Sequence, residues 1–438
     1  MSDLAKTPDT EKVQTATSGT VDAEPSATPA AAVDPRLLVR EQGFAGYWTE
    51  FVRKVRGGEL GSLPVVVGLI VIALVFQLQN DKFLSASSLA NIAVFTSGVG
   101  IMSVGIVFVL LLGEIDLSVG SVAGVGAAVW AVLSVTHGWG DWLSVVVAIA
   151  SGLVIGALHG FFFAKIGVPA FVVTLAGFLG WSGLQIWLMG KEGSINTPTG
   201  SVVEDLTTHF FADKAAAYGL ALIAVLAYGA SQYLDARRRK NAELPSRPLS
   251  EILLRTGLLA VLAFVAAYFL NEPEGARGLP LALVLFLAVL VIADFVARRT
   301  TFGRQVFAVG GNAEAARRAG INVDRVRITV FAISGMLAAF GGLFIASLSG
   351  GATKSLGAGN TLMMVIAAAV IGGTSLFGGR GKIWSAMLGM LVIQSIQQGL
   401  NLEGMPNEIQ YMITGAVLLA AVVIDSVSRK TQKSAGRA

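Results

Sequence analysis

An all-α bundle of membrane-spanning helices is the fold class that this sequence predicts. Hydrophobic residues make up 54% of its 438 residues and charged residues only 14%, whereas charged residues average about 25% in soluble proteins. The mean hydropathy is +0.70, and apolar runs of about 20 residues recur along the chain. These observations exclude an ordinary soluble globular protein and predict a polytopic membrane protein.

The chain before the first apolar run divides into two segments. Residues 1–35 are rich in Thr, Ala, Ser, Pro, Asp and Glu and have no apolar period, which is typical of a disordered tail. Residues 36–62 carry aromatic and basic side chains, as expected for a cytoplasmic juxtamembrane segment. No basic start followed by an apolar core occurs here, so we expect no signal peptide.

About twelve windows, within a range of ten to fourteen, are apolar enough to cross a bilayer. They are 63–79, 89–112, 115–135, 142–164, 168–190, 215–234, 251–270, 280–297, 328–348, 360–378, 383–400 and 409–427. Together they predict a transmembrane domain over 63–430, followed by a C-terminal tail at 431–438. The second, third and tenth windows are short or rich in glycine, which predicts broken or re-entrant helices there.

Basic residues are distributed unevenly among the connections. If the N-terminus is cytoplasmic, all but five of the 32 Lys and Arg residues fall on the cytoplasmic side. The five on the outer side are Lys82, Lys191, Lys214, Arg277 and Lys354. Because basic residues in short loops favour the cytoplasm, both termini and the loop 298–327 are predicted to be cytoplasmic.

The loop 298–327 contains a short helix with its own caps. Asn312 can accept the first free N–H groups, Glu314 lies at the positive end of the helix dipole, and Gly320 can adopt the left-handed stop. A helix this short is not stable alone in water. Its alanine face, flanked by arginines, favours a groove on a partner protein; a plain surface helix joining two spans is the alternative. The residues concerned are Asn312, Glu314, Ala315, Ala316, Arg317, Arg318 and Gly320.

Two carboxylates lie between the second and third windows. Burying an unpaired Asp at mid-membrane costs about 2.5 to 3.5 kcal/mol, so Glu114 and Asp116 either sit at the membrane boundary or line a wet cavity. A second glycine-rich segment, 372–379, shares glycine or leucine with 113–120 at three equivalent positions, Gly113 being equivalent to Gly372. This similarity indicates an internal repeat of two halves.

Polar residues within or beside the windows are candidates for a transport pathway or gate, although each of them can equally serve as an interhelical hydrogen bond. They are Asn91, Thr96, Glu114, Asp116, Ser118, Thr174, Gln185, Asn360, Thr374 and Ser375. Glycines at four-residue spacing, at 120 and 124 and again at 152, 156 and 160, predict close helix packing.

Catalytic and nucleotide-binding motifs are missing from the sequence. The nearest approach to a phosphate loop, at 378–382, fails at the required glycine and at the residue after Lys382. The chain has no cysteine, and its three histidines are far apart, so we expect neither a metal site nor a catalytic cluster. His159 is expected to be packed and neutral within a span. Transport work would therefore be powered by a partner or a gradient.

Four motifs together resemble a known family. They are GEIDLSVGS (113–121), VPAFVVTLAGFLG (168–180), TFGRQVFAVGGNAEAARRAGIN (301–322) and VIGGTSLFGGRG (370–381). In this order they resemble the permease subunits of bacterial monosaccharide ABC importers, which include ribose, xylose, arabinose and galactose permeases, and the xylose permeases most of all. The Glu314-Ala315-Ala316 and Gly320 pattern matches the start of the loop by which such permeases engage their ATPase, but the usual Leu-Pro ending is absent.

The resemblance implies a set of partners and a location in the bacterial cytoplasmic membrane. A cytoplasmic subunit would bind ATP and Mg and dock on the 312–320 helix, while this chain binds no cofactor. A binding protein would deliver the monosaccharide to the outer loops, and a second permease copy would complete the pathway within the lipid, with no role for nucleic acid. The alternatives are a gradient-driven sugar transporter, a membrane-embedded enzyme, and a permease of the same type with another small polar cargo.

Overall fold

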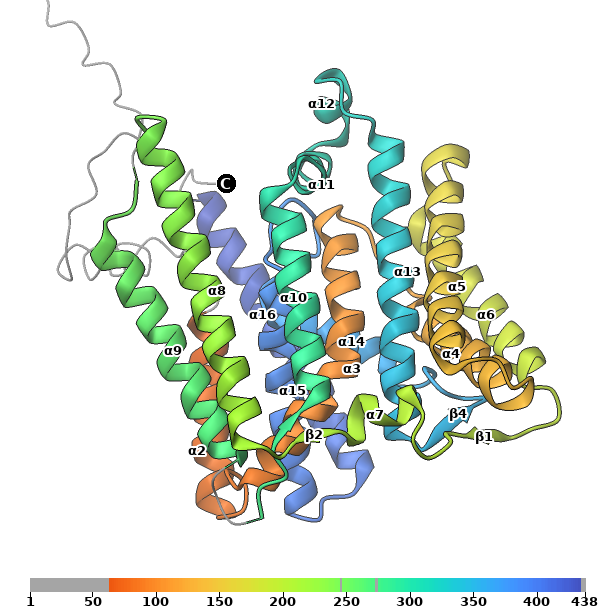
Figure 1. Ribbon diagram of the computed structural model, residues 1–438. Helices are drawn as coiled ribbons and strands as arrows, with labels where there is room; N and C mark the ends of the chain where they lie inside the picture. The colour runs from red at the N-terminus through yellow and green to blue at the C-terminus, as the bar shows by residue number, and fades with distance from the viewer. Residues whose placement is uncertain (1–62, 245, 272–274, 435–438) are drawn as a thin grey trace, which may run out of the picture. The chain divides into compact units, whose positions relative to one another are not determined.

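The computed structural model describes residues 63–244, 246–271 and 275–434. The predicted tail at 1–35 and the juxtamembrane segment at 36–62 lie outside these residues, as does the end of the predicted C-terminal tail. The described part is helical almost throughout, so the all-α prediction is confirmed (Figure 1).

The first half of the described chain contains six apolar helices joined at alternating ends. They are α2 (Leu63–Gln79), α3 (Ala86–Leu111), α4 (Val119–Ala131), α5 (Asp141–Phe161), α6 (Ala170–Met189) and α8 (Lys214–Asn241). Five-residue π-helical turns extend α4 and α5, as η1 (Val132–Thr136) and η2 (Phe162–Ile166). The connection between α6 and α8 holds β1 (Ser194–Asn196), α7 (Val202–Thr208) and β2 (Phe210–Phe211).

The second half begins with the hairpin partner of α8 and ends with the C-terminal helix. Its helices are α9 (Leu249–Asn271), α10 (Leu281–Arg299), α11 (Thr301–Gly311), α12 (Ala313–Arg318), α13 (Val323–Leu348), α14 (Thr361–Ile371), α15 (Trp384–Leu402) and α16 (Asn407–Ser434). Two short strands, β3 (Leu279–Pro280) and β4 (Gly351–Thr353), pair antiparallel with β2 and β1. These two ladders were not predicted.

Each of the twelve predicted windows coincides with a helix. Among the described residues, eight helices are long and apolar enough to cross a membrane: α3, α4 with η1, α5 with η2, α6, α8, α9, α10 and α13. The tenth window is broken as predicted, because α14 has 11 residues and a rise of about 17 Å, roughly half a bilayer core. The second window was wrongly expected to break, since α3 is continuous over 26 residues and the break follows it.

α13 is the central helix of the bundle and packs against α3, α4 and α5. A Cβ atom on Gly335 of α13 would overlap the carbonyl oxygen of Gly152, and a Cβ on Gly156 would overlap that of Phe331. The predicted glycine face of α5 therefore allows two backbones to meet. Gly120 instead packs against Gly357 in the loop before α14, whereas Gly124 packs against the Gln185 side chain of α6 and the Leu356 carbonyl.

The two ends of the bundle differ in what they carry. Figure 1 places α11, α12 and the C-terminal end of α8 at one end, which we call the α12 end, and α7, β1 and β4 at the other, the α7 end. Lys191, Lys214, Arg277 and Lys354 lie beside β1, β2, β3 and β4 respectively, so these predicted outer cations gather at the α7 end. The separation of charge between the ends agrees with the predicted orientation, which itself stays a prediction.

Candidate functional site

The predicted capped helix at 312–320 is confirmed as α12. The Asn312 side chain accepts a hydrogen bond from the Ala315 N–H at 2.9 Å. At the other end, Gly320 has φ +82°, its N–H donates to the Arg317 carbonyl at 3.0 Å, and the Ile321 N–H donates to the Ala316 carbonyl at 3.0 Å. This is the Schellman arrangement, in which a left-handed residue closes the helix. Local sequence alone therefore fixes both ends of α12.

One face of α12 is held by the chain itself and the other is free. Ala316 is buried at 5% exposure, so it anchors the helix, and we no longer expect it to contact a partner. Glu314 pairs with Arg317 at 3.5 Å and with Arg318 at 3.3 Å, and all three side chains are well exposed. Ala315 and Ala319 are exposed beside them. The surface available for docking is therefore formed by residues 314, 315, 317, 318 and 319.

A second helix in the loop, α11, was not predicted. The Thr300 hydroxyl accepts a hydrogen bond from the Gly303 N–H at 3.2 Å and begins the helix. Val306 and Val309 are buried, and this spacing of three residues was the available signal. A polar depression of about 550 Å³ lies between α11 and the start of α13. It is lined by Thr301, Phe302, Gln305, Gly320, Asn322, Arg325, Val326 and Thr329.

The C-terminal end of α11 packs directly on both glycine-rich segments. A Cβ atom on Gly310 would overlap the carbonyl oxygen of Leu111, the last residue of α3. The Gly379 N–H donates to the same carbonyl oxygen at 2.9 Å. A Cβ on Gly378 would lie 2.6 Å from the Gly310 carbonyl oxygen and 2.9 Å from the Gly113 nitrogen. Three backbones thus meet without side chains between them, and we call this contact the glycine junction.

The two segments end their preceding helices in the same way, but in a different register from the predicted one. The Gly113 N–H donates to Leu110 and the Glu114 N–H to Val109, and Gly113 has φ +82°. After α14, Gly373 has φ +97°, and the N–H groups of 373 and 374 donate to the carbonyls of 370 and 369. Gly113 therefore corresponds to Gly373, whereas Gly372 is right-handed. The predicted pairing of Gly113 with Gly372 was wrong by one residue.

Asp116 lies in a buried hydrogen-bond network that joins the segment before α4 to α13. Its Oδ1 accepts from the Ser118 N–H at 2.9 Å and from the Ser118 hydroxyl at 2.6 Å. Its Oδ2 accepts from the Ser334 hydroxyl of α13 at 3.1 Å. Asp116 is 3% exposed, and both serines are fully buried. Three donors on one carboxylate offset its loss of hydration, because charge-assisted hydrogen bonds are the strong ones.

The same network continues through His159 of α5 to Trp181 of α6. The Trp181 indole N–H can only donate, and it donates to His159 Nε2 at 2.8 Å. The proton of the neutral imidazole must then be on Nδ1, which lies 3.3 Å from the Ser118 hydroxyl oxygen. All donors therefore point one way, from Trp181 through His159 and Ser118 to Asp116. The expectation of a packed, neutral His159 agrees with this geometry.

Further contacts tie the start of α13 to the end of α5. Lys165 pairs with Asp324 at 3.0 Å, and the Arg327 guanidinium lies 4.4 Å from the centre of the Phe163 ring. Glu114 is half-buried nearby; burial raises the pKa of its carboxyl, and the positive charge of Arg327 opposes that rise. The helix that follows α12 is therefore fixed to α5 at its start and to Asp116 farther along.

The structure brings together only some of the ten predicted pathway residues. Asp116 and Ser118 share the network, and the Thr174 hydroxyl donates to the Ala170 carbonyl at 3.0 Å while also lying 3.4 Å from the Ile115 carbonyl oxygen. Thr374 and Ser375 are buried in the second glycine-rich segment. Within the described residues, the Thr374 hydroxyl has no hydrogen-bond partner.

The other predicted pathway residues lie elsewhere. Asn91 accepts a hydrogen bond from Arg277, and Gln185 donates to the carbonyls of Thr353 and Leu356 at 2.8 and 3.1 Å. Both therefore hold structure at the α7 end. Thr96 is buried in α3, and its hydroxyl has no partner among the described residues. Asn360 precedes α14 without capping it through its side chain.

A cavity of about 320 Å³ lies between α3, α5, α10 and α13. Its lining is entirely apolar and consists of Phe108, Ile149, Val289, Ile292, Ala293, Val296, Ile333, Met336, Leu337 and Phe340. A polar solute needs hydrogen-bonding groups to replace its water, so this cavity is unsuited to carry one.

Comparisons with known proteins agree over most of the chain. The family model described as "Branched-chain amino acid transport system / permease component" matches residues 88–422. The xylose transport system permease protein XylH of Escherichia coli is 36% identical over 368 residues, covering 84% of this chain and 92% of that protein. XylH of Haemophilus influenzae is 35% identical over 375 residues, covering 84% and 98%.

A more distant relative is the ribose import permease protein RbsC of Bacillus subtilis, which is 27% identical over 368 residues and covers 84% of this chain and 94% of its own length. No solved structure matches the chain. The long apolar helices and these relatives identify the chain as a multi-pass protein of the cytoplasmic membrane. The chain belongs to the family of transport-system permease components that the matching model describes.

Proposed function

We propose that two copies of this chain form the membrane pathway of an importer for a monosaccharide, with xylose as the first candidate. The relatives with 35% and 36% identity are named for xylose transport, and a more distant one is named for ribose import. A binding protein delivers the sugar, and a separate cytoplasmic subunit binds ATP and Mg and hydrolyses the nucleotide. The chain itself binds no cofactor and catalyses no reaction.

The docking site for the ATP-binding subunit is the exposed face of α12. The observation that carries this proposal is the position of α12 between α11, which packs on the glycine junction, and α13, which reaches Asp116. A force applied to α12 therefore acts at once on the ends of α3 and α14 and on the centre of the bundle. Packed elements of this kind move as rigid bodies, so a small displacement at one end is passed to the other.

The Asp116 network transmits that displacement within the membrane. It joins the break before α4 to α5, α6 and α13 through directed hydrogen bonds. Movement of α13 shifts Ser334 relative to Asp116. The non-helical segment between α3 and α4, which carries Asp116, must then move with α13, or the buried hydrogen bond between Ser334 and Asp116 is lost. Asp116 and Ser118 thus position the gate. The buried Thr374 and Ser375 belong to the second glycine-rich segment, whose Gly378 and Gly379 pack at the glycine junction.

The binding protein docks at the α7 end. Glu192 and Asp205 are exposed there and are available to a partner. The Glu204 carboxylate accepts a hydrogen bond from the Gly200 N–H, and the Asp213 carboxylate accepts one from the Ala215 N–H, so both shape the loop instead. The Thr207 and Ser347 hydroxyls, 2.5 Å apart, hold α7 on the end of α13.

Site-specific crosslinking tests the α12 docking surface, and the absence of native cysteine makes the background clean. We expect Ala315→Cys and Ala319→Cys to form disulfides with cysteines placed around the docking groove of the cognate ATP-binding subunit. Ala316→Cys is the matched control, because it lies in the same helix but is buried. Equal crosslinking at all three positions, or none at any, would remove α12 from the interface.

A further inference from the structure

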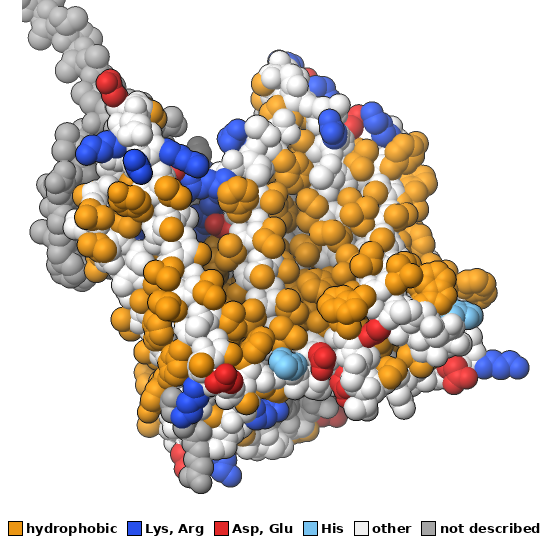
Figure 2. All heavy atoms as spheres, in the orientation of Figure 1, with side chains coloured by type: hydrophobic (Ala, Val, Ile, Leu, Met, Phe, Trp, Pro, Cys, Tyr) orange, Lys and Arg blue, Asp and Glu red, His pale blue; other side chains and the backbone are white. Residues whose placement is uncertain are grey.

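A corner rich in arginine lies at the α12 end, where α8, α9 and α10 meet. It is formed by the end of α8, the turn into α9, the first two turns of α9 and the last residue of α10. Figure 2 shows Lys and Arg side chains gathered over the end of α8 and toward α10. We call it the basic corner and define it as Arg237, Arg238, Arg239, Lys240, Arg247, Arg255 and Arg299.

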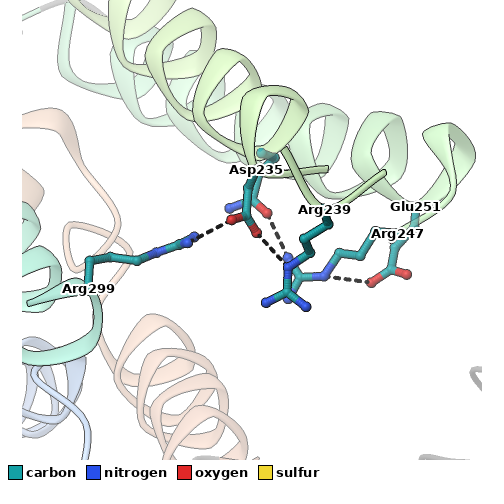
Figure 3. Close-up of polar contacts among 6 residues, drawn as sticks. Asp235, Arg239, Arg247, Glu251 and Arg299 are labelled. Carbon is teal, nitrogen blue, oxygen red and sulfur yellow. Dashed lines mark hydrogen bonds and ion pairs between the residues drawn. The ribbon is translucent and has the colours of Figure 1, made fainter. Parts of the chain in front are cut away.

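Two carboxylates hold four of these cations in place, as Figure 3 shows for most of them. Asp235 pairs with Arg299 at 2.9 Å and with Arg239 at 3.5 Å, which connects α10 to α8. Glu251, itself only 6% exposed, pairs with Arg255 at 2.9 Å and with Arg247 at 3.7 Å. Arg247 also donates to the Gln232 side chain at 2.6 Å. Cations from three helices and a turn are therefore fixed close together.

The corner retains a large excess of positive charge. Arg237, Arg238 and Lys240 are exposed and have no acidic partner among the described residues. The paired arginines are 41% to 54% exposed, so their guanidinium groups keep N–H donors free. Only one further carboxylate, that of Glu243, belongs to the same turn. The preference of Lys and Arg for cytoplasmic loops explains basic residues at the α12 end, but it does not require them to lie close together in one place.

The surface next to the corner is apolar. Tyr233, Leu234, Leu249, Leu253 and Leu254 are each about half exposed or more, and they lie within two turns of the cations on α8 and α9. A soluble anion needs no such surface, whereas acyl chains do. Arginine recognises phosphate oxygens with paired hydrogen bonds, and basic pockets between membrane helices suit anionic headgroups.

We propose that the basic corner is a binding site for the headgroup of an anionic phospholipid, whose acyl chains lie along α8 and α9. Arg239, Arg247 and Arg299, each already paired with a carboxylate, form the rigid base of the site. Arg237, Arg238 and Lys240 close around the phosphate. The lipid neutralises the excess charge and fastens the α8–α9 hairpin to α10, reinforcing the Asp235–Arg299 ion pair at this end.

Native mass spectrometry of the full chain in detergent with added phosphatidylglycerol tests this site. We expect Arg237→Gln/Arg238→Gln/Lys240→Gln to weaken phosphatidylglycerol binding roughly a hundredfold, as expected for removing three juxtamembrane cations. The control Lys82→Gln/Lys191→Gln/Lys354→Gln removes the same charge from other connections and should bind as the unaltered chain does. Unaltered size-exclusion profiles verify that both variants are folded.

Three outcomes would overturn the proposal. One is equal loss of lipid in both triple variants, which indicates attraction to net charge alone. Another is equally tight binding of phosphatidylcholine, which carries no net charge. The third is displacement of the lipid by millimolar inorganic phosphate, which indicates a site for a free anion rather than for a lipid.

Discussion

Gly310→Ala is expected to lower sugar uptake at least tenfold and to destabilise the protein by about 1 to 3 kcal/mol, the usual cost of overpacking a tight contact. The added methyl group would overlap the carbonyl oxygen of Leu111, and a backbone atom cannot rotate away. The junction would have to open, which separates α11 from the ends of α3 and α14. Local helix preference alone predicts the opposite, since Ala is favoured over Gly in a helix by about 1 kcal/mol.

The neighbouring glycine provides the matched control. A Cβ atom on Gly311, the last residue of α11, would meet nothing within 4 Å, so Gly311→Ala should leave uptake unchanged and thermal stability unchanged or slightly raised. Thermal unfolding and uptake in proteoliposomes measure both effects. If the two variants behave alike, the glycine junction does not connect the coupling loop to the bundle.

Asp116→Ala is expected to have the second large effect. It leaves the buried Ser118 N–H without its acceptor and removes the partner of two hydroxyl groups. A buried unsatisfied donor costs about 1 to 3 kcal/mol. The hydroxyl groups can rotate to other acceptors, so only the Ser118 N–H stays unsatisfied. We therefore expect the free energy of unfolding to fall by about 1 to 3 kcal/mol, together with loss of uptake.

Two further variants separate the roles of Asp116. Asp116→Asn keeps one acceptor oxygen and should recover most of the stability, while uptake stays low because the amide cannot accept on both sides. Glu114→Gln, on a half-buried neighbour, should be nearly as stable as the unaltered chain. Normal uptake by Asp116→Asn would return Asp116 to a purely structural role.

Features encoded in neighbouring residues could be predicted from the sequence. The helix α12 with its Asn312 cap and Gly320 stop depends on a few consecutive residues, and the apolar windows depend only on composition. The face that α12 buries could not be predicted, because alanines at 313, 315, 316 and 319 give no apolar period to follow.

The candidate site depends on contacts between distant parts of the chain. Ser334 donates to Asp116 across 218 positions, and Gly379 donates to Leu111 from the other end of the fold. A single sequence carries no signal for such pairs. For the same reason Asn91 and Gln185 were placed in the pathway on polarity alone, although their partners hold loops at the α7 end.

The central claim is that this chain is a conduit moved by a separate ATP-hydrolysing subunit, and sugar accumulation in proteoliposomes tests it most directly. The chain assembled with its ATP-binding subunit and binding protein should accumulate labelled xylose when ATP is supplied, with or without an ionophore. Unlabelled xylose should compete better than ribose or leucine. Accumulation by the chain alone, or its collapse on adding an ionophore while ATP remains, would contradict the account.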